Sequence, residues 1–206
     1  MVYFWVVKEN KTTSKAERTR RFIIEKTAPI FNKKGYAGTS LSDIAEATGL
    51  TKGSIYGNFA DKDEVALAAF DYNIARMSAV TKAEMAKQST VRGQLLVYVE
   101  VYENHMKYPF PVGGCPIMNT TVDADDTHPV LKSKVGQVVM SWKDRLVGLI
   151  EKGIANKEFK KDVDPEQTAL TFIAMIEGAI LINQATGRLD YRKKVMRSVE
   201  KLIKEL

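Results

Sequence analysis

The sequence is poor in the residues that most catalytic and metal sites require. It has one cysteine, Cys115, and two histidines, His105 and His128. A single cysteine excludes an intramolecular disulfide and fits a reducing, cytoplasmic location. The histidines lack metal-ligand spacing with Cys115, and no nucleophile or acid is paired with them. We therefore expect no enzyme activity, no metal and no cofactor.

Two kinds of segment are also missing. No stretch shows the strict alternation of apolar and polar residues that predicts a half-buried strand. No apolar run approaches the roughly 18 residues that span a bilayer, so we expect no membrane partner. The apolar residues 2–7 are too short for a signal-peptide core, and residues 1–13 are expected to form a flexible arm. These absences favour an all-α fold.

Positive charge is concentrated at one end of the chain. The formal net charge is +6 and the pI is about 9.2. Residues 1–60 hold ten Lys or Arg against five Asp or Glu, an excess of +5, whereas the remaining residues hold 21 against 20. Such a distribution favours a polyanionic partner at the N-terminal end. An ordinary solvated basic surface is the alternative.

The most specific pattern lies between residues 39 and 62. Ser40 to Asp43 have the S-x-x-D form of a capping box, which starts a helix. Gly49 suits the positive φ at a helix C-terminus, and Thr51 caps a second short helix over residues 52–58. Two short helices joined by a tight turn form a helix-turn-helix, whose second helix lies in the DNA major groove.

This stretch resembles the DNA-binding domain of the TetR-type transcriptional regulators, and the resemblance is specific over roughly residues 14–70. The matching positions are Thr39, Ile44, Ala45, Gly49, Leu50, Thr51, Gly53, Ser54, Ile55, Tyr56, Phe59 and Lys62. The resemblance implies that Lys52, Ser54 and Tyr56 contact the groove. It implies phosphate contacts by Thr39, Ser40 and Lys62. Thr51 and Gly53 complete the DNA-binding set, because small side chains let backbone and bases approach.

The chain departs from the family at two positions. Gly57 and Asn58 stand where an aromatic residue or histidine is usual, so a phosphate or base contact is lost or replaced. Tyr56 also has an alternative role, packing against the first helix. The competing function is therefore a ligand-binding helical protein that keeps the fold with little DNA-binding role.

The rest of the chain reads as helices separated by turns. Start signals at Ser14, Asp61, Thr90, Thr127 and Asp164 predict five longer helices. The segment 108–119 contains three prolines and two glycines and is predicted to be a loop or broken helix, and the acidic residues 123–126 are predicted to be a solvated loop. The expected domains are a helix-turn-helix domain over 14–60 and a helical effector-binding and dimerisation domain over 61–206.

The family resemblance implies a homodimer formed by the last two long helices, within residues 165–206. The first of these helices is apolar on most of its circumference, which suits one face for its own core and one for a partner. A single buried helix in a monomer is the alternative. A dimer would match a palindromic operator, since half-sites lie one helical turn apart.

The resemblance also implies an internal pocket for a small-molecule effector that releases a repressor from DNA. The candidate lining residues are Tyr98, Tyr102, Met106, Phe110, Cys115, Met118, Met140, Trp142, Met175 and Glu177. Met and aromatic side chains suit a permissive apolar pocket, although they more often form core. Cys115 lies in a Gly-Gly-Cys-Pro sequence that resembles family members with a sensing cysteine; the alternative is a small buried hydrophobic residue.

Overall fold

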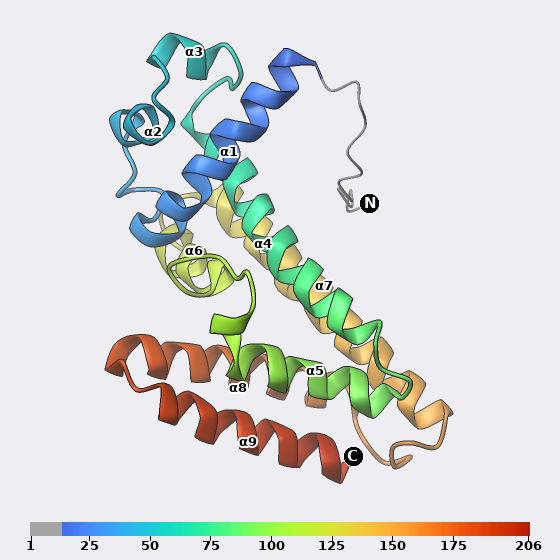
Figure 1. The fold of residues 1–206 in the computed structure, drawn as a ribbon. Helices are drawn as coiled ribbons and strands as arrows, with labels where there is room; N and C mark the ends of the chain where they lie inside the picture. The colour runs from blue at the N-terminus through green and yellow to red at the C-terminus, as the bar shows by residue number, and fades with distance from the viewer. Residues whose placement is uncertain (1–13) are drawn as a thin grey trace. The chain divides into compact units, whose positions relative to one another are not determined.

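The computed structural model describes residues 14–206, so the expected arm over 1–13 lies outside the described residues. Within 14–206 the chain forms nine α-helices, one short 3-10 helix and no strand, which confirms the all-α fold (Figure 1). The elements are α1 (Lys15–Lys34), α2 (Leu41–Thr48), α3 (Lys52–Tyr56), α4 (Lys62–Met85), α5 (Val91–Glu103), η1 (His105–Lys107), α6 (Pro116–Ala124), α7 (Pro129–Ala155), α8 (Pro165–Thr186) and α9 (Leu189–Glu205).

Local capping chemistry sets most helix starts. Ser14 and Ser40 each form a reciprocal capping box with the acidic residue three positions later. Asp164 accepts hydrogen bonds from the backbone N–H groups of Glu166 and Gln167, and proline occupies the first position of α8. These contacts satisfy backbone donors that have no partner inside the helix, so the predicted starts at Ser14, Ser40 and Asp164 are confirmed. The predicted cap at Thr127 is wrong, because α7 begins at Pro129 and the His128 side chain accepts the hydrogen bond from the Leu131 backbone N–H.

The segment 108–119, predicted to be a loop or a broken helix, contains both a loop and the start of a helix, because α6 begins at Pro116. The acidic stretch is not wholly a solvated loop, since Asp123 lies in the last turn of α6 and accepts a hydrogen bond from the Tyr36 backbone N–H at 2.5 Å. Its partner is 87 positions away, so no local pattern could reveal this contact.

The chain divides into two compact units that differ from the expected boundary at residue 60. Unit 1 comprises residues 14–77 together with Pro111–Lys132, and unit 2 comprises Ser78–Phe110 together with Ser133–Leu206. Two of the three divisions fall inside α4 and α7, and the third falls between η1 and α6. Each unit therefore contains segments that are far apart in the sequence.

The core of unit 1 fixes the helix-turn-helix. Ile23 of α1, Ile44 of α2 and Ile55 of α3 are fully buried in one apolar cluster with Phe59 and Val65. Every helix of the motif thus contributes a large side chain to the same core. Burial of each of these side chains stabilises the fold by about 1.5–3 kcal/mol, which explains how a five-residue helix is held in place.

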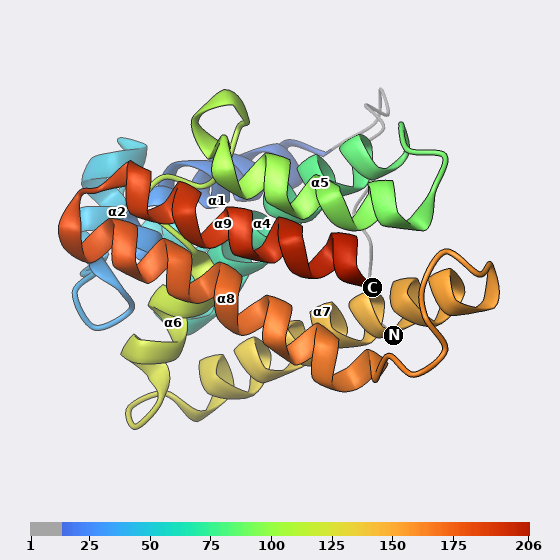
Figure 2. The same cartoon turned by 90° about the horizontal axis from the view of Figure 1, so that it is seen from below.

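In unit 2, α9 packs against both α8 and α5. Figures 1 and 2 show α8 and α9 side by side along most of their length, with α5 next to α9. The α9 face toward these helices buries Met196, Val199 and Ile203. The Arg92 guanidinium of α5 donates to the carbonyl oxygens of Ile203 and Glu158, which ties the start of α5 to the end of α9.

The apolar character of α8 exceeds the sequence-based expectation. Its 22 residues include an 18-residue window of mean hydropathy 1.4, so by length and composition this helix could cross a membrane. The expectation that no run approaches such a length was therefore wrong. Only 28% of that window is buried within the chain. Leu170, Leu181 and Ile182 are 49%, 54% and 39% exposed, which leaves an apolar surface on α8.

Candidate functional site

The α3 helix is anchored on one side and open on the other. The Ser54 backbone N–H donates to the Thr51 hydroxyl at 3.2 Å, so Thr51 is the N-cap. Ile55 is buried, whereas Thr51, Lys52 and Gly53 are exposed and Ser54 is half-buried. The Tyr56 ring is 50% exposed. The open side therefore presents donors and small side chains together with one aromatic ring.

Arg20 of α1 fixes the end of this helix. Its guanidinium donates to the Asn58 carbonyl oxygen at 2.5 Å and to the Glu64 carboxylate at 2.6 Å, and it lies 4.0 Å from the centre of the Phe59 ring. The pKa of Glu64 is lowered, first by the hydrogen bond from the Ala60 backbone N–H and then by Arg20. One cation thus joins α1, the end of α3 and the start of α4.

The two positions that depart from the family pattern have different roles. Asn58 donates from its side-chain amide to the Ser54 carbonyl oxygen at 2.9 Å and so closes the last turn of α3. Gly57 is exposed, with φ of −71°, and a Cβ there would lie no closer than 3.4 Å to its nearest neighbour. The backbone therefore does not require glycine at position 57.

Three expected phosphate contacts differ in accessibility. Ser40 is exposed and caps α2 with Asp43, whose pKa is well below its usual range because of hydrogen bonds from Lys34 and then Ser40. Thr39 is 1% exposed, and its hydroxyl donates to the Gly35 carbonyl oxygen at 2.6 Å. A phosphate contact by the Thr39 side chain does not agree with this burial, which the motif alone could not show.

Lys62 is bound within unit 1. Its ammonium donates to the carbonyl oxygens of Tyr36 and Thr39 at 3.0 and 3.1 Å and lies 3.9 Å from the centre of the Tyr36 ring. An ammonium has three donors, so one remains for an external acceptor. Lys62 therefore holds the turn between α1 and α2 while staying half-buried at the start of α4.

A polar network that the sequence analysis missed lies beside Lys62. The Tyr36 hydroxyl donates to Asp63, which raises the pKa of Tyr36 to about 12. The His128 Nε2 atom lies 3.4 Å from the other Asp63 oxygen, and the His128 Nδ1 atom accepts from the Leu131 backbone N–H at 3.2 Å. No residue spacing signals this network, because its members come from distant segments.

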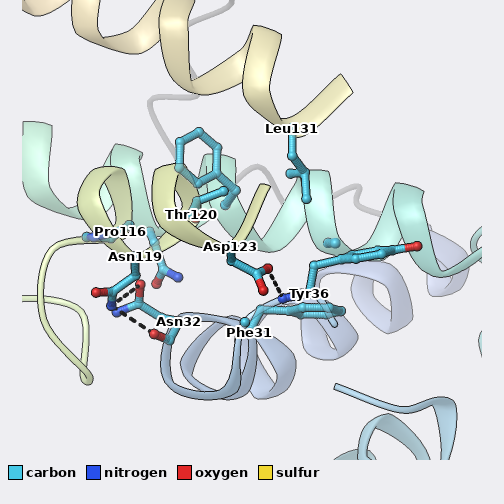
Figure 3. A pocket seen from close by; sticks show the side chains of 12 residues that line it. Phe31, Asn32, Tyr36, Pro116, Asn119, Thr120, Asp123 and Leu131 are labelled. Carbon is cyan, nitrogen blue, oxygen red and sulfur yellow. Dashed lines mark hydrogen bonds between the residues drawn. The ribbon is translucent and has the colours of Figure 1, made fainter. Parts of the chain in front are cut away.

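A second polar seam fastens α6 to the last turn of α1. The Asn32 amide donates to the carbonyl oxygens of Val112 and Gly114 at 2.9 and 3.1 Å. The Asn119 amide donates to the carbonyl oxygens of Asn32 and Gly113 at 2.9 and 2.8 Å. Figure 3 shows Asn119 facing Asn32, and Asp123 facing the Tyr36 amide.

A shallow pocket, partly open to solvent, lies along this seam. Phe31, Phe70, Pro116 and Leu131 supply its apolar wall, and Asn119 and Asp123 supply polar groups (Figure 3). None of the ten residues expected to line the effector pocket borders it. It is therefore a different feature of unit 1.

Four of the expected effector residues do meet, in unit 2. Tyr98, Tyr102 and Trp142 are buried, and their ring centres lie 6.2–6.3 Å apart. The Phe110 ring lies 5.6 Å from Tyr102. These rings come from α5, α7 and the loop after η1, so tertiary contacts gather them into one aromatic cluster.

The other six are not gathered there. Cys115 and Met118 belong to unit 1, where Cys115 is 3% exposed. Met106 and Met140 are 81% and 52% exposed, so the expectation that they line an enclosed pocket does not agree with the structure. Met175 and Glu177 are half-buried on α8. Helical spacing predicted an apolar face but could not distinguish core from surface methionines.

Comparisons with known proteins agree with this architecture. The family model described as "Bacterial regulatory proteins, tetR family" matches residues 23–69, and the model described as "Tetracyclin repressor-like, C-terminal domain" matches residues 92–199. A sequence relative, the HTH-type transcriptional repressor DhaR of Mycobacterium sp. (strain GP1), is 24% identical over 79% of this chain and 80% of its own length.

Two solved structures are similar over almost the whole chain. A TetR-family regulator from Cytophaga hutchinsonii is 53% identical, with a TM-score of 0.90, over 94% of this chain and 96% of its own. A TetR regulator from Chloroflexus aurantiacus J-10-FL is 34% identical, with a TM-score of 0.87, over 92% of this chain and 96% of its own. With a helix-turn-helix in unit 1 and a helical C-terminal part, the chain belongs to the TetR family of transcriptional regulators.

Proposed function

We propose that the protein is a transcriptional repressor that binds a palindromic operator as a homodimer and is released by a small-molecule effector. The observation that carries this proposal is that α3 is exposed on one side, while the buried side chains of Ile23, Ile44 and Ile55 hold the motif in position. Lys52, Gly53, Ser54 and Tyr56 are the proposed groove contacts, with Thr51 at the helix start. A recognition helix must be both accessible and fixed in position, because base contacts depend on its register.

The proposed phosphate contacts are Ser40 and Lys62. Ser40 is exposed at the N-terminus of α2, where backbone N–H groups and the helix dipole favour an anion. Lys62 has one remaining donor beside its two carbonyl acceptors. Thr39 is left out of the proposed contacts because its hydroxyl is buried and already donates to Gly35.

The proposed dimer forms through α8 and α9. Leu170, Leu181 and Ile182 leave apolar surface on α8 that one chain does not cover. Large exposed apolar patches are typical of interaction sites, and obligate homodimer interfaces resemble a core cut in half. A dimer would therefore account for the apolar character of α8 in a DNA-binding protein of cytoplasmic location.

A binding experiment on the DNA upstream of the protein's own gene tests this function. We expect a gel shift at nanomolar to micromolar concentrations of protein. The double change Lys52→Ala and Tyr56→Ala should lower the affinity for this DNA at least tenfold. Lys152→Ala, an exposed position on α7 outside the proposed dimer interface, is the matched charge control. Equal binding to the upstream fragment and to unrelated DNA would favour the alternative, a ligand-binding helical protein with little DNA-binding role.

A further inference from the structure

Two buried polar groups in unit 2 lack a hydrogen bond of normal geometry. Tyr98 is 3% exposed and Trp142 is 8% exposed. Neither the Tyr98 hydroxyl nor the Trp142 indole N–H makes such a bond to any described residue, although the Trp142 N–H and the Arg145 guanidinium make weak hydrogen-bonding contacts with the Tyr98 hydroxyl. Buried groups of this kind are nearly always paired with protein or with ordered water. A hydrogen-bond acceptor inside the aromatic cluster would therefore pair with the Tyr98 hydroxyl and the Trp142 N–H.

These two groups and one cation converge. The Tyr98 and Trp142 ring centres are 6.2 Å apart. Arg145 follows Trp142 by three positions on α7, so both side chains lie on one side of that helix. Burial raises the pKa of Tyr98, whereas the charge of Arg145 and the hydrogen-bonding contacts of Trp142 and Arg145 with the Tyr98 hydroxyl oppose part of that rise. Among described residues, Arg145 is the charged group acting on Tyr98, and it is positive.

The surroundings of these donors are flat and apolar. The Tyr102 ring is within 19° of parallel to Tyr98 and within 13° of parallel to Trp142, at 6.3 Å from each ring centre. Aromatic pairs have ring centres 4.5–7 Å apart, so these distances lie toward the wide end of that range. A planar guest can stack on such flat apolar surfaces, and it would enter through side-chain rotations.

We propose that unit 2 binds an aromatic carboxylate, with its ring against Tyr98, Tyr102 and Trp142 and its carboxylate accepting hydrogen bonds from the Tyr98 hydroxyl and the Trp142 N–H beside Arg145. This inference rests on the proposed function, since it names the chemical class of the effector. A hydrocarbon would accept no hydrogen bond from either donor. A cation would be repelled by Arg145 and would offer nothing to accept their hydrogen bonds. An anion satisfies the donors and the charge together.

Direct binding to the full-length protein is the first test. The chain has two tryptophans, Trp5 and Trp142, so the Trp5→Phe protein reports on Trp142 alone by fluorescence. The probes are sodium benzoate and 2-naphthoate, with their methyl esters as neutral isosteres and benzylamine as a cation. We expect the two acids to perturb Trp142 fluorescence and to bind at least tenfold more tightly than their esters, with no binding of benzylamine.

Conservative variants then locate the carboxylate. Tyr98→Phe and Trp142→Phe each remove one donor and keep an aromatic ring. Measured by calorimetry, each is expected to weaken 2-naphthoate binding by about tenfold or more while changing ester binding little. Arg145→Gln is expected to have the same selective effect. Tyr191→Phe, a hydroxyl deletion on α9 outside the aromatic cluster, is the matched control and should stay within about twofold.

The variants also distinguish an effector from a trapped water. If the donors make only weak contacts without ligand, removing either one should leave the melting temperature of the free protein nearly unchanged or higher. A lower melting temperature with unchanged naphthoate affinity would mean that ordered water pairs them, and would overturn the proposal. Equal affinity for acid and ester, or binding of neither acid, would also overturn it. Failure to shift the upstream DNA refutes the proposed repressor function and leaves the acid-binding result standing.

Discussion

At the scale of single residues, two glycines of the same motif have opposite requirements. Gly49 ends α2 with φ of +67°, a left-handed conformation that side chains disfavour, and a Cβ there would meet nothing within 4 Å. Gly57 has φ of −71° and space for a Cβ. The backbone therefore requires glycine at 49 for its angle alone and does not require it at 57.

Alanine at each position should separate these cases. Gly57→Ala is expected to stabilise the protein by about 0.4–1 kcal/mol, because alanine lowers the entropy of the unfolded chain without strain. Gly49→Ala is expected to destabilise it by about 1–2 kcal/mol. Urea denaturation measures both. A destabilised Gly57→Ala protein would show that the end of α3 needs a backbone freedom that its φ does not reveal.

Lys62 is expected both to contact DNA and to stabilise the fold. Lys62→Ala is expected to weaken binding to specific and unrelated DNA alike and to reduce the salt slope of binding by about one, since one phosphate contact is lost. It should also lower stability by about 1–2 kcal/mol, because the Tyr36 and Thr39 carbonyl oxygens lose their donor. Binding is measured by fluorescence anisotropy across a salt series.

The Lys152→Ala control removes an equal charge from an exposed site on α7 and should change neither quantity much. An unchanged salt slope for Lys62→Ala, with lowered stability, would restrict Lys62 to holding the turn between α1 and α2. Thr39 shows why such roles can be assigned only from the tertiary structure. The motif identifies Thr39 by type and position, whereas its 1% exposure follows from packing.

At the scale of elements, α6 is the helix that the sequence described least well. The prolines and glycines of residues 108–119 predicted a loop or a broken helix, and no local pattern indicated where a helix would begin. The helix is held by Asn119, which donates to Asn32 and Gly113, and by Asp123, which accepts from the Tyr36 N–H. The contacts with Asn32 and Tyr36 join segments about 87 residues apart, so only the folded chain reveals them.

Removing the Asn119 amide should loosen this attachment. Asn119→Ala is expected to cost about 1–2 kcal/mol, because the carbonyl oxygens of Asn32 and Gly113 lose a shared donor. Hydrogen exchange over residues 111–124 should increase with it. Val122→Ala is the matched control, since Val122 is 80% exposed on the same helix and should change stability by less than about 0.5 kcal/mol. Equal exchange in both variants would contradict this role for Asn119.

At the scale of the whole molecule, the apolar surface of α8 carries the dimer prediction. Leu181→Asp places a charge on that surface, where Leu181 is 54% exposed in the single chain. We expect it to raise the dimer dissociation constant at least about tenfold, because the charge would be desolvated in an interface. Sedimentation at micromolar concentration measures the change.

Met106→Asp, at a position 81% exposed and outside α8, is the control and should leave the association unchanged. A wild-type protein that sediments as a monomer would refute the dimer. Equal weakening by both variants would place the interface elsewhere than the Leu181 surface.

The sequence by itself determined the helices and the motif. Capping residues, helix-ending glycines and apolar periodicity act over three or four positions, so Ser14, Ser40, Thr51 and Asp164 could be identified without coordinates. The family pattern is local for the same reason, and its departure at Gly57 and Asn58 is visible in one line of sequence.

Only the tertiary structure decided which residues meet. It divided the expected effector residues between the two units, buried Thr39, exposed Met106, and gathered Tyr98, Tyr102 and Trp142 around donors that lack a hydrogen bond of normal geometry. Burial and pairing depend on contacts between distant segments, and helical spacing reports the direction of a side chain without its neighbours. Local chemistry thus specified the helices, and tertiary packing determined which of their side chains are buried and which residues they contact.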